Sequence, residues 1–185
     1  RLIKKARDQK RAEAVIASAP TRPAGIELRC CGVDELVAKV RGAGLVHADP
    51  NWIYNNNQNG AAGGHYDTSH LEEIARIINL AFDCVATDTY LLLWVTGPML
   101  RPWFMASQHL RWRYLSKGAW GKRLSESDRK GAGYHWRGDS EDLLLYAKGN
   151  PAPFDNNMSN FHLGPRTQHS EKPEAWLREL IDGFC

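Results

Sequence analysis

The chain has 185 residues, of which 43% are hydrophobic, and a formal net charge of +3. This is the size and composition of one globular domain with its own core, and the mild positive charge permits a polyanionic partner without requiring one. No apolar run reaches the roughly 18 residues of a membrane span, and the basic start lacks the apolar core of a signal peptide. The four cysteines lack CxxC spacing, which favours reduced thiols in a cytoplasmic protein over a disulfide framework or a zinc site.

The pattern along the chain predicts alternating strands and helices. Residues 1–25 are expected to be a basic helix and a proline-containing linker, which is either a solvated surface or a nucleic-acid contact, and the main domain is expected at 26–185. Strands are predicted at 26–31, 44–48, 89–96, 111–117 and 142–148, and helices at 33–40, 69–81, 99–109 and 172–184. This alternation indicates an α/β domain with a largely parallel sheet, in which ligands gather at the carboxyl ends of the strands.

The segment "ADPNWIY" (48–54) places an acid at such a strand end. The Asp49 carboxylate and the Pro50 carbonyl can accept both hydrogens of one amino group, and Trp52 offers a flat face for a base. This trio suits the exocyclic amine of adenine, because two acceptors make its lone pair available and the carboxylate stabilises the developing positive charge. His47 is not expected to converge with Asp49, because neighbours along a strand point to opposite faces, so no metal site is predicted.

These residues resemble the DPPW signature of the adenine-N6 methyltransferases that include the messenger-RNA m6A writer and many bacterial and phage DNA enzymes. Further blocks resemble the family in the same order along the chain: "GAAGGHYDT" (60–68), "LLLWVTGPML" (91–100), "GAGYHWRGDSEDLLLYAKGNP" (131–151) and "QHSEKPEAWLRELIDGF" (168–184). The phrasing is most similar to phage and bacterial members.

The resemblance implies a Rossmann-like fold that uses S-adenosylmethionine to methylate adenine N6 in DNA, with RNA as the less favoured substrate. The target base would be flipped or single-stranded, because the amine is paired in a duplex. The implied catalytic residues are Asp49, Pro50 and Trp52; Asn51, Tyr66 and Glu141 would bind substrate, and Asp49, Ser170 and Lys172 the cofactor. The resemblance is also compatible with a homodimer or heterodimer in the cytoplasm of a bacterium or an infected cell.

Two departures from the family pattern stand out. Asn51 replaces the second proline of the signature, which frees the backbone that would hold Pro50. The family's cofactor-binding strand, with its glycine turn, is expected after the last helix, so we expect it to come from further sequence or from a partner.

Three functions remain open from the sequence. The first is an active adenine-N6 methyltransferase. The second is a catalytically degenerate homologue that binds nucleic acid or a partner enzyme, which the two departures favour. The third is an α/β nucleotide-binding module without transfer chemistry, against which Asp49, Tyr66 and Lys172 argue.

Overall fold

A five-stranded mixed sheet organises the chain in the computed structural model, which describes residues 33–52, 71–123, 138–153, 158–165 and 171–183. The strands are β1 (Leu45–Ala48), β2 (Thr89–Val95), β3 (Arg113–Arg123), β4 (Ser140–Lys148) and β5 (Phe161–Pro165), in the spatial order β1-β2-β4-β3-β5. The helices are α2 (Val33–Val40), α3 (Leu71–Cys84), α4 (Gly97–Ala106), which continues into a short 3-10 turn (Ser107–His109), and α5 (Glu174–Asp182). The α/β class predicted from the sequence is confirmed.

Most predicted elements of the described residues are present with small shifts of their ends. The helix predicted at 33–40 has those bounds, and α3 buries Ile74, Ile78 and Ala81 on the face that the spacing indicates. The strand predicted at 89–96 is β2, whose seven residues are all buried. The strand predicted at 26–31 and the domain boundary at 25 lie outside the described residues.

The prediction of a largely parallel sheet is wrong. β1 pairs with β2, and β3 with β5, in parallel, whereas β4 runs antiparallel to both of its neighbours. The apolar run of β2 correctly predicts that both of its faces are covered. Burial, however, carries no information about the direction of the neighbouring strand.

Two strand segments escaped the sequence analysis because they contain glycine. Residues 118–123 lie beyond the strand predicted at 111–117 but form the second half of β3, and β5 was not predicted at all. Glycine is required at 118, because a Cβ there would lie 2.9 Å from the Asn160 carbonyl oxygen and 3.2 Å from the Trp176 ring. Glycine within a strand marks such a close approach, here between β3, β5 and α5.

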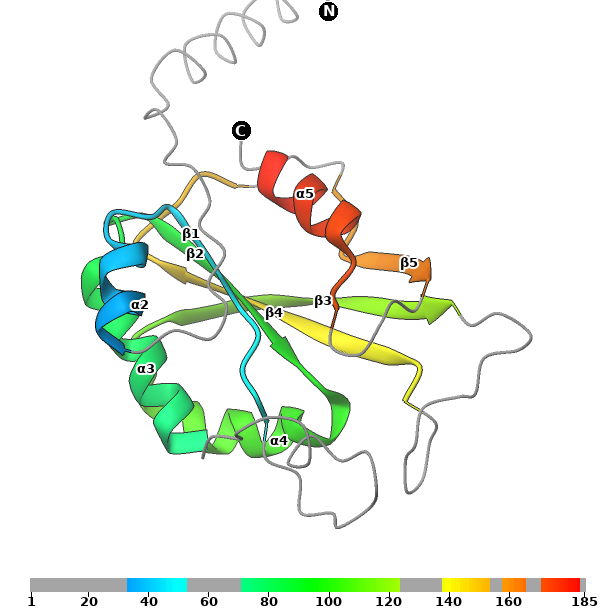
Figure 1. Cartoon of the computed structure of the whole chain (residues 1–185), viewed down its shortest axis with the longest axis horizontal. Coiled ribbons are helices and arrows are strands. Elements are labelled where there is room, and N and C mark those ends of the chain that lie inside the picture. The colour runs from blue at the N-terminus through cyan, green and yellow to red at the C-terminus, as the bar shows by residue number, and fades with distance from the viewer. Residues whose placement is uncertain (1–32, 53–70, 124–137, 154–157, 166–170, 184–185) are drawn as a thin grey trace, which may run out of the picture.

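Helices cover both faces of the sheet and create two hydrophobic clusters. Helices α2, α3 and α4 follow one another along one side, while α5 lies beside β5 on the other (Figure 1). The six tryptophans in the described part of the chain are all buried and divide equally between the clusters: Trp52, Trp103 and Trp112 on the α2–α4 side, and Trp94, Trp120 and Trp176 on the α5 side. All six are therefore residues of the core.

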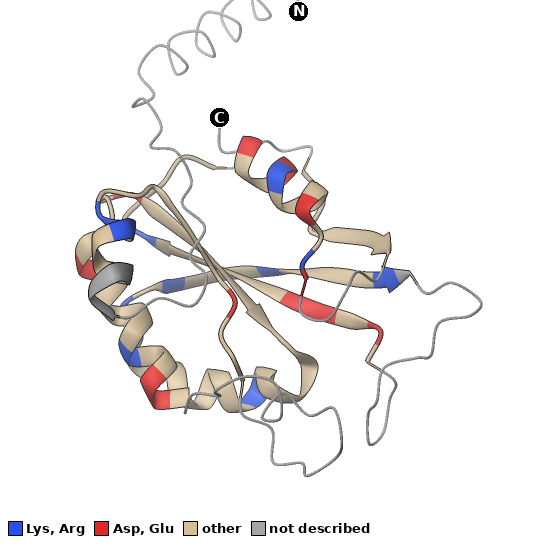
Figure 2. Ribbon diagram, in the orientation of Figure 1, with Lys and Arg blue, Asp and Glu red and all other residues tan. Residues whose placement is uncertain are grey.

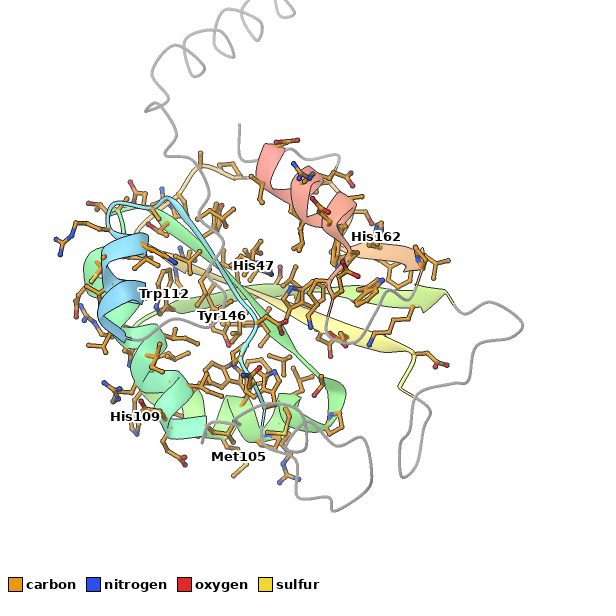
Figure 3. The ribbon with its side chains drawn as sticks, in the orientation of Figure 1. His47, Met105, His109, Trp112, Tyr146 and His162 are labelled. Atoms are coloured by element: carbon orange, nitrogen blue, oxygen red, sulfur yellow. The ribbon has the colours of Figure 1, made fainter. Side chains whose placement is uncertain are left out.

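The buried indoles also carry polar contacts that position them. Trp103 Nε1 donates to the Tyr146 hydroxyl at 2.9 Å, and Trp112 Nε1 donates to the Ile78 carbonyl at 3.0 Å. In Figure 3, Trp112 lies beside α2 and α3, whereas His162 lies beside α5. Among the described residues, no helix combines the length and apolar character needed to cross a membrane.

Replacing the central core residue Leu144 by alanine should destabilise the fold. Leu144 is 0% exposed in β4, so Leu144→Ala removes buried methyl groups and should lower the free energy of unfolding by about 2–5 kcal/mol in urea titrations. Leu163→Ala is the matched control, because Leu163 is also in a strand but is 51% exposed, and it should cost under about 1 kcal/mol. Equal losses for the two variants would contradict the arrangement of the sheet faces.

Candidate active site

Four charged side chains meet where β1 ends and α5 begins. Asp49 directly follows β1, and Lys172 precedes α5, whose N-cap is Pro173. Glu141 is the second residue of β4 and pairs with Trp120 of β3. Lys122 follows Trp120 by two residues on the same strand. Figure 2 shows acidic and basic segments of the ribbon close together near the start of α5 and the neighbouring strand ends.

The four groups form a chain of alternating charge, hereafter the acid–base network. Lys172 Nζ lies 3.0 Å from Asp49 Oδ2 and 3.1 Å from Glu141 Oε2, and Lys122 Nζ lies 2.5 Å from Glu141 Oε1. The side chains of Lys172, Glu141 and Lys122 are 12%, 14% and 16% exposed, whereas that of Asp49 is 35% exposed. Asp49 is therefore the member that a ligand can reach. The other three are more buried, and Lys172 joins Asp49 to them.

The protonation behaviour of the network follows from burial and mutual attraction. Loss of hydration raises the pKa of the Asp49 carboxyl above its ordinary value, and Lys172 opposes that rise. For Glu141, loss of hydration acts in the same direction, but Lys172 and Lys122 together outweigh it and lower the pKa. Burial lowers the pKa of Lys172, yet its two carboxylate neighbours leave it raised. The site thus holds one firmly ionised glutamate and one aspartate with increased affinity for a proton.

Two indole rings lie beneath the lysines of the network. Lys172 Nζ is 5.4 Å from the centroid of the Trp94 ring, and Lys122 Nζ is 5.0 Å from that of Trp120. Such cation–π contacts help to keep an ammonium group in place where water is scarce. Neither indole contact was anticipated from the sequence, because each depends on how the strands pair.

A hydrogen bond to Trp94 positions the His47 side chain near the network. Residues two apart along a strand share a face, and His47 Nε2 accepts a hydrogen bond from Trp94 Nε1 at 2.7 Å. His47 therefore lies on the α5 side of the sheet, on the same indole that supports Lys172. The described residues contain no group of three or more His, Cys, Asp or Glu side chains that could hold a metal ion.

The other predicted site residues have different positions. Pro50 is half-buried and Asn51 is exposed. Trp52 is only 4% exposed and meets Trp103 edge to face, with ring centroids 5.6 Å apart, so it presents no open face to a base in this structure. Tyr66 and Ser170 lie outside the described residues. Of the predicted set, the structure thus brings together Asp49, Glu141 and Lys172, and it adds Lys122.

The exposed end of the network carries groups that can bind a charged ligand. The Asp49 carboxylate can accept from an ammonium group, and the neighbouring Lys172 ammonium can pair with a carboxylate.

No protein-family model matches the chain, and a comparison with curated proteins gives no match either. A functional assignment therefore depends on the residues of the acid–base network and on their arrangement.

Removing the bridging lysine should destabilise the protein more at neutral than at acidic pH. Lys172→Met leaves Asp49 and Glu141 without their shared cation, so the free energy of unfolding should fall by roughly 2–4 kcal/mol near pH 7. Because the pKa of Glu141 is lowered, its ionised form stabilises the fold at pH values above its ordinary pKa of 4.5. This contribution is lost as the pH falls through the lowered pKa. The variant loses this contribution, so the difference from the wild type should shrink as the pH falls below about 4.5.

The control for this measurement is Arg178→Met on the adjacent helix. Arg178 pairs with Glu174 in a fully solvated i,i+4 contact, with side chains 72% and 75% exposed, so its loss should leave the free energy of unfolding nearly unchanged at either pH. A pH-independent loss for Lys172→Met would show that the lysine contributes by packing rather than by charge.

Proposed function

We propose that the chain is an adenine-N6 methyltransferase of Rossmann-like fold that acts on flipped or single-stranded adenine in DNA and uses S-adenosylmethionine. The observation that carries the proposal is the position of Asp49: it follows β1 directly, precedes Pro50, and is the most exposed member of an otherwise buried acid–base network. Ligands in α/β sheets gather at such strand ends.

Asp49 and Pro50 would hold the target amine. The Asp49 carboxylate and the Pro50 carbonyl each accept one of its two hydrogens, which turns the nitrogen lone pair away from the ring and toward the methyl donor. S-adenosylmethionine would supply a methyl group on a positively charged sulfur, and the neutral thioether would be the leaving group. The amine then loses one proton, for which the Asp49 carboxylate is a suitable acceptor because burial raises its pKa.

The rest of the network would keep Asp49 in place. Lys172 binds the Asp49 carboxylate at 3.0 Å and is itself held by Glu141, which Lys122 pairs in turn. Trp52 anchors the chain from the core side, because its buried ring packs on Trp103. This anchor restrains the backbone between Asp49 and Trp52 even though Asn51 stands where the family signature has a second proline.

A catalytically inactive homologue is the second candidate, and Asn51 is the observation that favours it. Without a proline at 51, the backbone of Pro50 is less restrained, and small displacements of a catalytic acceptor reduce rates steeply. Such a protein would retain the network for binding nucleic acid or a partner enzyme.

Replacing Asp49 by asparagine should abolish methylation. Asp49→Asn retains the size of the side chain but removes its charge and its capacity to accept a proton, so methyl transfer to single-stranded DNA should fall at least about a hundredfold. The matched control is Asp83→Asn, which alters a surface acid that pairs with Arg111 at 51% and 60% side-chain exposure and should retain full activity. A wild-type protein that binds DNA without methylating it would instead support the inactive homologue.

Restoring the second proline tests the role of Asn51. Asn51→Pro should raise the methylation rate, because proline fixes its own backbone and holds Pro50 extended. Single-turnover measurements separate this effect from changes in DNA binding. A lower rate would show that the site has adapted to asparagine, through its amide or its backbone N–H.

A further inference from the structure

The hydrogen bond between His47 and Trp94 has no part in the chemistry described so far. Trp94 is 1% exposed, and its Nε1–H donates to His47 Nε2 at 2.7 Å. An indole N–H is only a donor, so this imidazole nitrogen must be unprotonated, and in neutral His47 the proton is on Nδ1. The bond therefore specifies both the orientation of the imidazole and its tautomer.

Trp94 depends on this acceptor. A buried N–H group that loses its partner costs the full penalty of its lost hydration. The neighbouring Trp120, on the same side of the sheet, shows that an acceptor is not guaranteed there, because its buried Nε1 has no hydrogen-bond partner among the described residues. With His47 in place, the Trp94 ring is fixed against Trp120 and Trp176, whose centroids lie 6.2 and 5.9 Å away at steep interplanar angles.

The fixed ring in turn supports the lysine of the active site. Lys172 Nζ lies 5.4 Å from the Trp94 centroid and 3.0 Å from Asp49 Oδ2. A ring that tilts or shifts changes the surface on which the ammonium rests, and the ammonium is what orients Asp49. A continuous path of contacts thus leads from His47 through Trp94 and Lys172 to Asp49.

We propose that His47 is a positioning residue for the Asp49 site, and that it acts by holding the Trp94 indole on which Lys172 rests. His47 need not touch the substrate to do so. The inference rests on the proposed function only where it concerns the rate of methylation, since the effect on Lys172 and Asp49 is a property of the folded protein alone.

Two variants of similar polarity separate the possible roles of His47. In His47→Gln, the side-chain oxygen can occupy the place of Nε2 and accept from Trp94. In His47→Asn, the oxygen reaches only the place of Nδ1, so the bond is lost. If His47 served only to fill space or to supply polarity, the asparagine variant would not stand apart from the glutamine variant.

The first measurement uses NMR of the full chain. The Trp94 indole N–H resonance should move upfield in His47→Asn and stay near its wild-type position in His47→Gln. The Asp49 carboxyl, followed by carbon-detected titration, should have a higher pKa in His47→Asn, because Lys172 lowers that pKa and is displaced. An unchanged Asp49 titration together with a lost indole bond would overturn the proposal, whether or not the protein is a methyltransferase.

The second measurement is methylation of single-stranded DNA. In His47→Asn, kcat should fall by about tenfold while KM for DNA is unchanged, and His47→Gln should restore kcat to within about threefold of wild type. Full kcat in His47→Asn would overturn the positioning role. Absence of methylation in the wild type would refute the proposed function, and the NMR titration would still decide the inference.

If His47→Asn fails to fold, Trp94→Phe removes the same hydrogen bond and keeps an aromatic ring, and it should raise the Asp49 pKa in the same way.

Discussion

The contact of Lys172 with two carboxylates is the interaction on which the site depends. Burying the Glu141 carboxylate alone would carry a large cost in lost hydration, and the Lys172 cation, which also pairs with the more exposed Asp49, offsets it. Lys172 precedes α5, whereas Asp49 follows β1 and Glu141 lies near the start of β4. This contact therefore also connects α5 to the sheet. The same charge that stabilises the fold keeps one exposed carboxylate oriented at a strand end.

The buried tryptophans make different contacts on the two faces of the sheet. On the α2–α4 side, buried indoles satisfy their N–H groups with Tyr146 and with the backbone of α3, and they serve the core. On the α5 side, Trp94 and Trp120 lie beneath the ammonium groups of Lys172 and Lys122. One face is thus ordinary packing, while the other combines packing with the support of buried charge.

How far the sequence predicts this arrangement depends on what each pattern encodes. The apolar spacing of α3 and the uninterrupted apolar run of β2 predicted both elements, since burial determines both patterns. Strand direction has no such signature, and the short β5, with its glycine and proline, resembles a loop. Asp49, Glu141 and Lys172 were predicted together from a family resemblance, and the structure places them in contact. Lys122 and the two supporting indoles could not be predicted, because they meet the site only through the register of β3 against β4.

The acid–base network draws its four members from widely separated parts of the chain: the end of β1, the end of β3, the start of β4 and the turn before α5. No two of them are close neighbours in sequence, so the loops that join them must all close before the charges can meet. In a partly folded chain, each of these charged groups remains hydrated and unpaired. The environment of Asp49 therefore forms only once the sheet and α5 have assembled, so a misfolded or nascent chain lacks the paired and partly dehydrated carboxylate altogether.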